Sequence, residues 1–272
     1  YNNSLLRSSC WFDSGRGHSK SLSKAFFILS GGKVMTYYFI GGLGCNVYYP
    51  QDFFTALKLP IVYLDLYGQE IRQEADLEEW FALQVDLTEE VTLIAHSLGA
   101  DFAVYLASVF PSVKKLILLD GGYLNLDKIC NLEEEIADAL TYLEKTSYSS
   151  IEEAVSLERY EAKHWSENCS KAVKANLVFN KKAQVWKLGI SQQIVKNLLT
   201  LRRLMYGCLS KLRDCQIHLF IPQQTESDPS WKVKALQELP DNVQLAEVKD
   251  CGHNIYGDNP LGLAKMVRSV LD

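Results

Sequence analysis

The sequence lacks the motifs of the commonest nucleotide and metal sites. Its 272 residues contain no G-x-x-x-x-G-K-[ST], no G-x-G-x-x-G and no H-E-x-x-H, the patterns of a phosphate loop, a dinucleotide-binding turn and a zinc-binding helix. The 7 cysteines include no C-x-x-C pair, which excludes a zinc ribbon and argues against a disulfide framework. We therefore expect no metal or other cofactor, and a location in the reducing cytoplasm.

Basic charge and long apolar runs are also scarce. A net charge of -5 leaves no excess of Lys and Arg to bind phosphates, so nucleic acid is not an expected partner. The apolar run Ala25–Leu29 is far shorter than the roughly 20 residues of a membrane-spanning helix, and no signal-peptide pattern opens the sequence. We expect a small-molecule partner and no membrane insertion, and no pattern specifies an oligomeric state.

The composition is that of an ordinary globular protein, with 47% apolar and 22% charged residues. Short apolar segments alternate with helical stretches from Thr36 onward. Most of these segments are apolar almost throughout, which is typical of parallel strands covered by helices on both faces. The sequence thus predicts an α/β fold with a mostly parallel sheet, whose strands are Tyr37–Ile40, Ile61–Leu64, Val91–Ala95, Leu116–Leu119, Gln216–Ile221 and Val243–Val248.

One long segment interrupts this alternation. Between Asp120 and Gln216 the strand pattern is absent, and helical periodicity covers Leu132–Glu144, Ile151–Glu167 and Gln192–Leu212. We therefore divide the chain into a core of residues 35–123 and 211–272, an inserted helical cap of residues 124–210, and an amino-terminal segment of residues 1–34. That last segment is interpreted as a tag, as sequence upstream of a start at Met35, or as edge strands.

Ser97 lies between an apolar strand and a helix. Residues 91–100 read VTLIAHSLGA, with Ala95 and Gly99 two places before and after the serine. Small residues at both places are needed by the tight turn called a nucleophile elbow, which exposes the serine hydroxyl. In such a turn the backbone N–H of Leu98 faces a reacting oxyanion. The alternative interpretation is a serine that caps a helix.

Further motifs occur in order along residues 36–272, and together they resemble the α/β-hydrolase superfamily. They are FIGGLG at residues 39–44, IVYLDLYG at 61–68, the turn around Ser97, and a helix and strand over 102–120 that ends in Leu-Leu-Asp. The resemblance implies that the first motif supplies a second oxyanion donor, the N–H of Leu43. This chain has Gly41 where the family usually has histidine.

A serine nucleophile requires a base within hydrogen-bond reach. Of the 5 histidines, His253 is the strongest candidate, because it lies in DCGHN after the last predicted strand, and this loop resembles the superfamily's catalytic-histidine loop. His96 adjoins Ser97, but adjacent side chains of the turn diverge, so we expect it to pack in the interior. No argument places His18, His164 or His218 near the serine.

The base in turn requires a carboxylate that holds its tautomer. Asp228 follows the strand Gln216–Ile221 and precedes His253 by 25 residues, which matches where the superfamily places its acid. Glu226 is the alternative acid, and a purely structural Asp-Pro turn is the other interpretation of Asp228. Asp65 and Asp120 also end strands at the presumed active edge, but residues so placed more often cap turns or helices.

These features predict a serine hydrolase that cleaves a small or medium acyl ester or thioester through an acyl-enzyme on Ser97. The aromatic and aliphatic content of residues 124–210 favours an apolar acyl or aromatic group in the substrate. Two alternatives remain open: a carbon–carbon bond hydrolase or lyase on the same fold, and a non-catalytic binding protein on that fold.

Overall fold

The computed structural model describes residues 36–271, so the segment 1–34 lies outside the described residues. Six strands form one sheet in the order β2-β1-β3-β4-β7-β8, and every neighbouring pair is parallel. All six coincide with predicted strands. They are β1 (Thr36–Ile40), β2 (Ile61–Leu64), β3 (Val91–His96), β4 (Val113–Leu119), β7 (Gln216–Pro222) and β8 (Val243–Val248).

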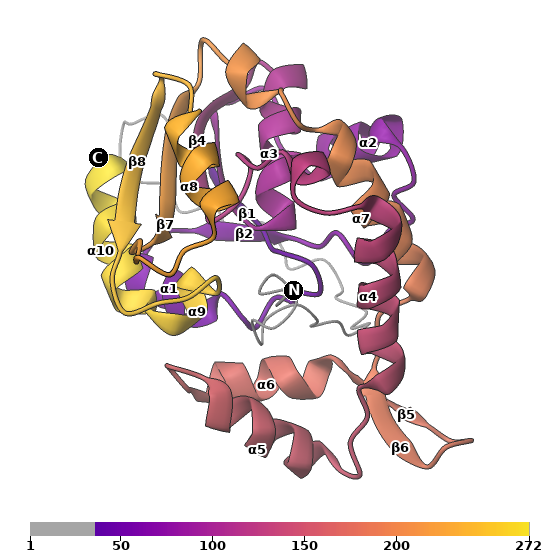
Figure 1. Cartoon of the computed structure of the whole chain (residues 1–272). Coiled ribbons are helices and arrows are strands. Elements are labelled where there is room, and N and C mark those ends of the chain that lie inside the picture. The colour runs from indigo at the N-terminus through magenta and orange to yellow at the C-terminus, as the bar shows by residue number, and fades with distance from the viewer. Residues whose placement is uncertain (1–35, 272) are drawn as a thin grey trace.

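Helices cover both faces of this sheet (Figure 1). One face carries α1 (Gln51–Leu57), α9 (Ile255–Asp258) and α10 (Pro260–Leu271), and the other carries α2 (Glu74–Gln84), α3 (Leu98–Val109) and α8 (Ser230–Gln237). Within residues 36–271, no helix combines the length and the apolar character needed to cross a bilayer.

The strands are apolar throughout because successive side chains enter two different cores. In β1, Tyr38 and Ile40 pack under α2 and α3, whereas Tyr37 and Phe39 pack against α1 and α10. The two-residue period of a strand sends neighbours to opposite faces, and both faces are buried here. This arrangement confirms the predicted α/β class with a mostly parallel sheet.

The chain between β4 and β7 is mainly helical, and part of it lies away from the sheet (Figure 1). It contains one feature that was not predicted, the antiparallel hairpin of β5 and β6, whose four-residue strands are too short for a clear pattern. Its elements are η1 (Leu126–Lys128), α4 (Leu132–Lys145), α5 (Ile151–Glu161), α6 (Glu167–Ala175), β5 (Leu177–Asn180), β6 (Val185–Leu188), α7 (Gln192–Leu204) and η2 (Leu209–Lys211).

Two of the predicted helices in this segment are longer than the observed ones. The stretch Ile151–Glu167 contains α5 and then a break, because Ser166 caps a new helix by accepting hydrogen bonds from the N–H groups of Asn168 and Cys169. Helix α7 ends at Leu204 rather than Leu212. Gly207 follows with φ of 88°, a left-handed conformation that interrupts the helical path and favours glycine.

A buried group of charged side chains joins this segment to α3. Arg202 of α7 donates to Asp101 of α3 at 2.9 Å and to Glu135 of α4 at 3.4 Å. Glu135 also accepts from Arg203, which donates to Asp127 at 2.9 Å. Glu135 lies in a run of three glutamates near the start of α4, yet it is only 6% exposed, because it is the shared acceptor of two buried guanidinium groups.

Replacement of Glu135 by alanine is expected to lower the free energy of unfolding by about 3–5 kcal/mol, because two buried guanidinium groups lose their common carboxylate. Urea unfolding measures this change. Glu134→Ala is the matched control, since Glu134 is exposed on the same helix, and its effect is expected within about 0.5 kcal/mol. Equal effects of the two substitutions would contradict a special role for the buried carboxylate.

Candidate active site

Ser97 occupies a sharp turn between β3 and α3. Its backbone has φ of 52° and ψ of -123°, a conformation that a residue with a side chain adopts only when its surroundings impose it. Gly99 permits this turn, because a Cβ there would lie 2.4 Å from the carbonyl oxygen of Gly41 and 2.5 Å from that of Ile40. The turn leaves Ser97 partly exposed at the carboxyl end of the sheet.

His253 lies next to Ser97. It follows β8 in the loop before α9, and its Nε2 atom is 2.9 Å from Ser97 Oγ. Its ring is partly buried, with 24% of the side chain exposed. This geometry allows the imidazole to accept the serine proton without a movement of the backbone.

His96 supports the loop that carries His253. Its Nε2 lies 2.8 Å from the backbone carbonyl oxygen of His253, which can only accept, so Nε2 carries the hydrogen and Nδ1 is left as an acceptor. Burial lowers the pKa of His96 to about 3, and the charge of His253 acts in the same direction. The sequence predicted an interior position for His96, but not this contact with the histidine loop.

The carboxylate beside His253 is Asp120, not Asp228. Asp120 Oδ2 lies 2.7 Å from His253 Nδ1. The end of β4 is close to the turn, since Ser97 N donates to the Leu119 carbonyl and a Cβ on Gly121 would lie 2.5 Å from the Ser97 carbonyl oxygen. Asp120 has φ of 44°, so its backbone turns directly after the strand and the side chain reaches the imidazole.

Asp120 is mainly ionised in this environment. Burial opposes its ionisation, but the hydrogen bond and electrostatic interaction with His253 and the charge of Lys232 keep the pKa of this carboxyl below its ordinary value. An ionised carboxylate at Nδ1 fixes the tautomer in which Nε2 can accept the serine proton.

The two acids suggested by the sequence are placed differently. The Asp228 carboxylate accepts a hydrogen bond from the Thr225 hydroxyl at 3.0 Å and lies 3.8 Å from Lys232 Nζ. It stands just before α8, where it stabilises a turn and a local ion pair. Glu226 is exposed. Asp228 therefore has the structural role of a turn residue in this arrangement.

The loop after β1 passes directly beside Ser97. A Cβ on Gly42 would lie 3.1 Å from Ser97 Cβ. The Tyr67 hydroxyl fixes the loop by donating to the Gly42 carbonyl and accepting from the Gly44 N–H, both at 2.6 Å. Gly41 stands where a larger residue would collide, because its Cβ would lie 2.5 Å from Cys45 Cβ.

The two residues predicted to donate to an oxyanion flank this site. Leu98 is the first residue of α3, and the N–H of such a residue has no acceptor within its own helix. Leu43 follows Gly42 in the loop beside Ser97, and its side chain is buried, with 5% exposed. A buried side chain anchors the backbone of the loop next to the serine.

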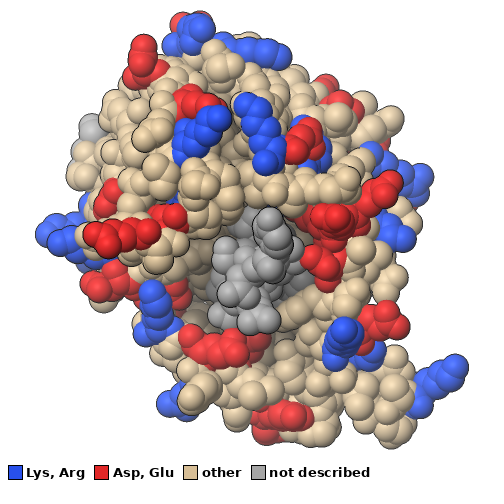
Figure 2. Space-filling model, in the orientation of Figure 1, with Lys and Arg blue, Asp and Glu red and all other residues tan. Residues whose placement is uncertain are grey.

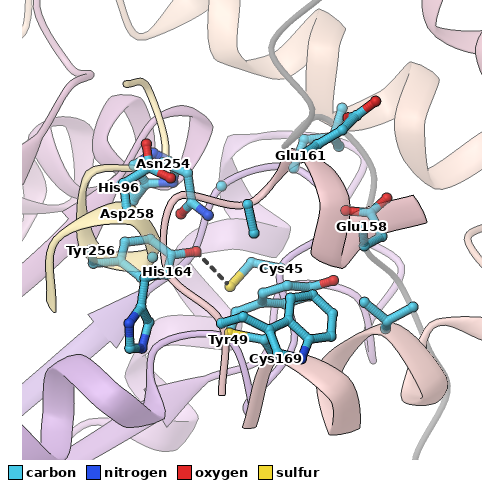
Figure 3. Close-up of a pocket in the computed structure, with 16 residues that line it drawn as sticks. Cys45, Tyr49, His96, Glu158, Glu161, His164, Cys169, Asn254, Tyr256 and Asp258 are labelled. Carbon is cyan, nitrogen blue, oxygen red and sulfur yellow. Dashed lines mark hydrogen bonds between the residues drawn. The ribbon is translucent and has the colours of Figure 1, made fainter. Parts of the chain in front are cut away.

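A pocket lies between the core and the inserted segment (Figure 3). Gly42, Leu43 and His96 contribute from the core, and Glu158 and Trp165 contribute from the segment. Several hydrogen bonds hold the segment against the core: Asp52 pairs with His164 at 3.0 Å and accepts from Asn168 at 2.7 Å, and Asn46 donates to Ala172 and Asn176.

Among residues 36–271, no group of three or more His, Cys, Asp and Glu side chains has an arrangement that could hold a metal ion. The acid and base groups at Ser97 are instead arranged in a line, from Asp120 through His253 to the hydroxyl. Such an arrangement can move a proton and activate a nucleophile.

Buried neutral His96 makes the protein sensitive to acid. The unfolded chain binds a proton at this residue below pH 6.5, whereas the folded protein does so only near pH 3, so the free energy of unfolding falls as the pH is lowered through this range. Between pH 7 and pH 5, we expect His96 alone to contribute a loss of about 2 kcal/mol.

Urea unfolding at pH 7 and pH 5 measures this loss. In His96→Gln the carboxamide N–H can still donate to the His253 carbonyl, but the side chain does not titrate. The variant is therefore expected to lose less stability than the parent protein between the two pH values. Equal losses would show that His96 is not the titrating group.

Comparisons with known proteins bear on the fold. No family model and no curated protein matches this sequence. Solved structures do match. An esterase of Mycobacterium tuberculosis has a TM-score of 0.67 and 20% identity, over 89% of this chain and 87% of that one. A thioesterase domain of the curacin biosynthetic pathway has a TM-score of 0.62 and 17% identity, over 85% and 90%.

A third similar structure is a peroxisomal α/β-hydrolase of Saccharomyces cerevisiae. It has a TM-score of 0.64 and 13% identity, over 87% of this chain and 76% of that one. These likenesses extend over most of each chain, and they agree with the parallel sheet order and the flanking helices described above. The chain has the α/β-hydrolase fold.

Proposed function

We propose that this protein is a serine hydrolase that cleaves a small or medium acyl ester or thioester through an acyl-enzyme on Ser97. The observation that carries the proposal is the continuous hydrogen-bonded line from Asp120 through His253 to Ser97 Oγ, with distances of 2.7 Å and 2.9 Å. A serine is a weak nucleophile unless a base lies within such reach. The esterase and thioesterase among the similar structures are consistent with this reaction.

In the acylation step, Ser97 Oγ attacks the carbonyl carbon while His253 Nε2 accepts its proton. The Asp120 carboxylate stabilises the imidazolium that forms. The carbonyl oxygen becomes an oxyanion, to which the N–H groups of Leu43 and Leu98 donate in this proposal. The tetrahedral intermediate collapses as His253 returns the proton to the leaving alcohol or thiol.

Deacylation repeats this sequence with water. His253 removes a proton from a water molecule, which attacks the acyl carbon, and then protonates Ser97 Oγ as the acid product leaves. The proposed reaction needs only these side chains and backbone groups, and therefore no cofactor. In the proposal, the inserted segment covers the site and limits the size of the substrate, since it supplies part of the pocket wall.

Covalent labelling tests this proposal directly. The purified protein is treated with a fluorophosphonate probe, and the modified peptide is identified by mass spectrometry. We expect a single active-site adduct on Ser97, because its hydroxyl lies beside a base. The same preparation is assayed with p-nitrophenyl acetate, butyrate and octanoate, whose relative rates report the size of the acyl pocket.

The outcomes separate the proposed activity from its alternatives. Labelling of Ser97 with ester turnover supports the proposal. Labelling without turnover of any ester or thioester would favour a carbon–carbon bond hydrolase or lyase. Absence of both labelling and turnover would contradict the proposal and favour a non-catalytic binding protein on the same fold.

A further inference from the structure

The pocket near Ser97 has carboxylates on the side of the inserted segment. Ser97 and His253 do not line it, but Gly42 does, and a Cβ on Gly42 would lie 3.1 Å from Ser97 Cβ. Glu158 and Glu161 of α5 line the pocket, and they lie on the side away from His96, Asn254 and Asp258 (Figure 3); Glu158 is partly buried and Glu161 is exposed. Burial raises the pKa of Glu158 to about 7, and the neighbouring charge of Glu161 adds to this effect. A positive charge near Glu158 would stabilise its ionised form and lower this pKa.

The described residues around the pocket do not supply that charge. Those that line it include no Lys or Arg. His164 lines the pocket but pairs with Asp52 at 3.0 Å, and Lys163 acts on Asp258 at another part of the wall. Lys/Arg and Asp/Glu side chains are interspersed over the face of the molecule drawn in Figure 2.

Two buried polar atoms of the same wall have no hydrogen-bond partner among residues 36–271. They are Nδ1 of His96, whose residue is only 3% exposed, and the hydroxyl oxygen of Tyr49. Since Nε2–H of His96 is engaged with the His253 carbonyl, Nδ1 can only accept. A buried acceptor without a partner has a desolvation cost that a ligand with a hydrogen-bond donor would remove.

Aromatic rings complete the wall. Tyr49, Trp165 and Tyr256 line the pocket together with the two glutamates. The faces of such rings attract cations, and a Trp face does so most strongly. Carboxylates, aromatic faces and an unsatisfied acceptor together form a site for a group that is positively charged and donates hydrogen bonds.

We propose that this pocket binds a primary ammonium group, so that the natural substrate of Ser97 is an ester or thioester that carries an amine. The inference rests on the proposed function, and it adds a charged group to a substrate for which the composition of residues 124–210 favours an apolar acyl or aromatic group. Glu158 and Glu161 provide the charge, and Tyr49, His96 and Trp165 provide hydrogen bonding and ring contacts.

Inhibition by n-hexylammonium and by 1-hexanol tests this inference. The two compounds have the same chain length and differ in the charged head. The substrate is p-nitrophenyl acetate and the pH is 8.5, at which the amine is protonated and Glu158 is ionised. We expect the inhibition constant of hexylammonium to be at least about tenfold lower than that of 1-hexanol. Equal inhibition constants would overturn the inference.

Substituted variants identify which side chains cause the preference for hexylammonium over 1-hexanol. Glu158→Gln/Glu161→Gln is expected to abolish the preference for the ammonium compound, whereas Glu152→Gln is expected to retain it. Glu152 is an exposed residue of the same helix and does not line the pocket, so it controls for the loss of charge on α5. A preference that survives in the double variant would contradict the assignment of the site.

Calorimetric titration of Ser97→Ala protein with hexylammonium separates the two proposals. Binding of hexylammonium by this variant needs no turnover. If the parent protein hydrolyses esters but hexylammonium does not bind, the ammonium inference fails and the proposed function stands. If hexylammonium binds but the parent protein hydrolyses no ester or thioester, the proposed function fails instead.

Discussion

Replacement of Asp120 by asparagine is expected to lower kcat for p-nitrophenyl esters by roughly a thousand- to ten-thousand-fold. The amide has nearly the same shape as the carboxylate, but it can donate a hydrogen bond to His253 Nδ1. It would then favour the tautomer with hydrogen on Nε2, which cannot accept the proton of Ser97. The amide also lacks the charge that stabilises the imidazolium.

Asp228→Asn is the matched control, because it removes a carboxylate from the loop where the sequence alone places the acid. Its expected effect on kcat is small, since the Asp228 side chain interacts with Thr225 and Lys232. Steady-state kinetics of both variants compare the two carboxylates. A large loss in Asp228→Asn together with near-normal activity in Asp120→Asn would contradict the assignment.

Ser97→Ala and His253→Ala are each expected to lower kcat by roughly 10⁴- to 10⁶-fold. Ser97 forms the bond to the acyl group, and His253 is the group within hydrogen-bond distance of its hydroxyl. Neither residue can perform its part of the reaction when the other is absent. The Ser97→Ala/His253→Ala double variant is therefore expected to be no slower than either single variant.

The double variant also provides the test of this interpretation. Residues that contribute independently would give losses that multiply, whereas residues that act as one unit give losses that do not. Circular dichroism of each variant verifies that the fold is retained. A multiplicative loss would show that Ser97 and His253 do not act in the same step.

Sequence patterns alone determined the strands of the sheet and the choice of Ser97 and His253 as the proposed nucleophile and base. The six strands were predictable because strands buried on both faces are apolar almost throughout, as Tyr37 to Ile40 are. Ser97 and His253 were predictable because each lies in a short loop with a characteristic local sequence. Local sequence suffices for such loops, since a tight turn restricts which residues can occupy it.

The identity of the carboxylate beside His253 depended on contacts between distant parts of the chain. Asp228 has the favourable spacing from His253, yet spacing along the chain does not determine which loop reaches the imidazole. The relevant signal was present, since Asp120 ends the strand Val113–Leu119. Only the tertiary structure shows that this strand is adjacent to β3 and that φ of 44° turns Asp120 toward His253.

In the inserted segment too, the sequence predicted some features and only the tertiary structure showed others. Its helical periodicity was evident from the sequence, but the burial of Glu135 and the position of Glu158 at the pocket were not. A glutamate near the start of a helix has the same local pattern whether it faces water or a buried arginine. The sequence by itself thus determined the strands of the main sheet and the proposed nucleophile and base. The tertiary structure decided which carboxylate lies beside His253 and which charges line the pocket, because both depend on which residues distant in sequence come together.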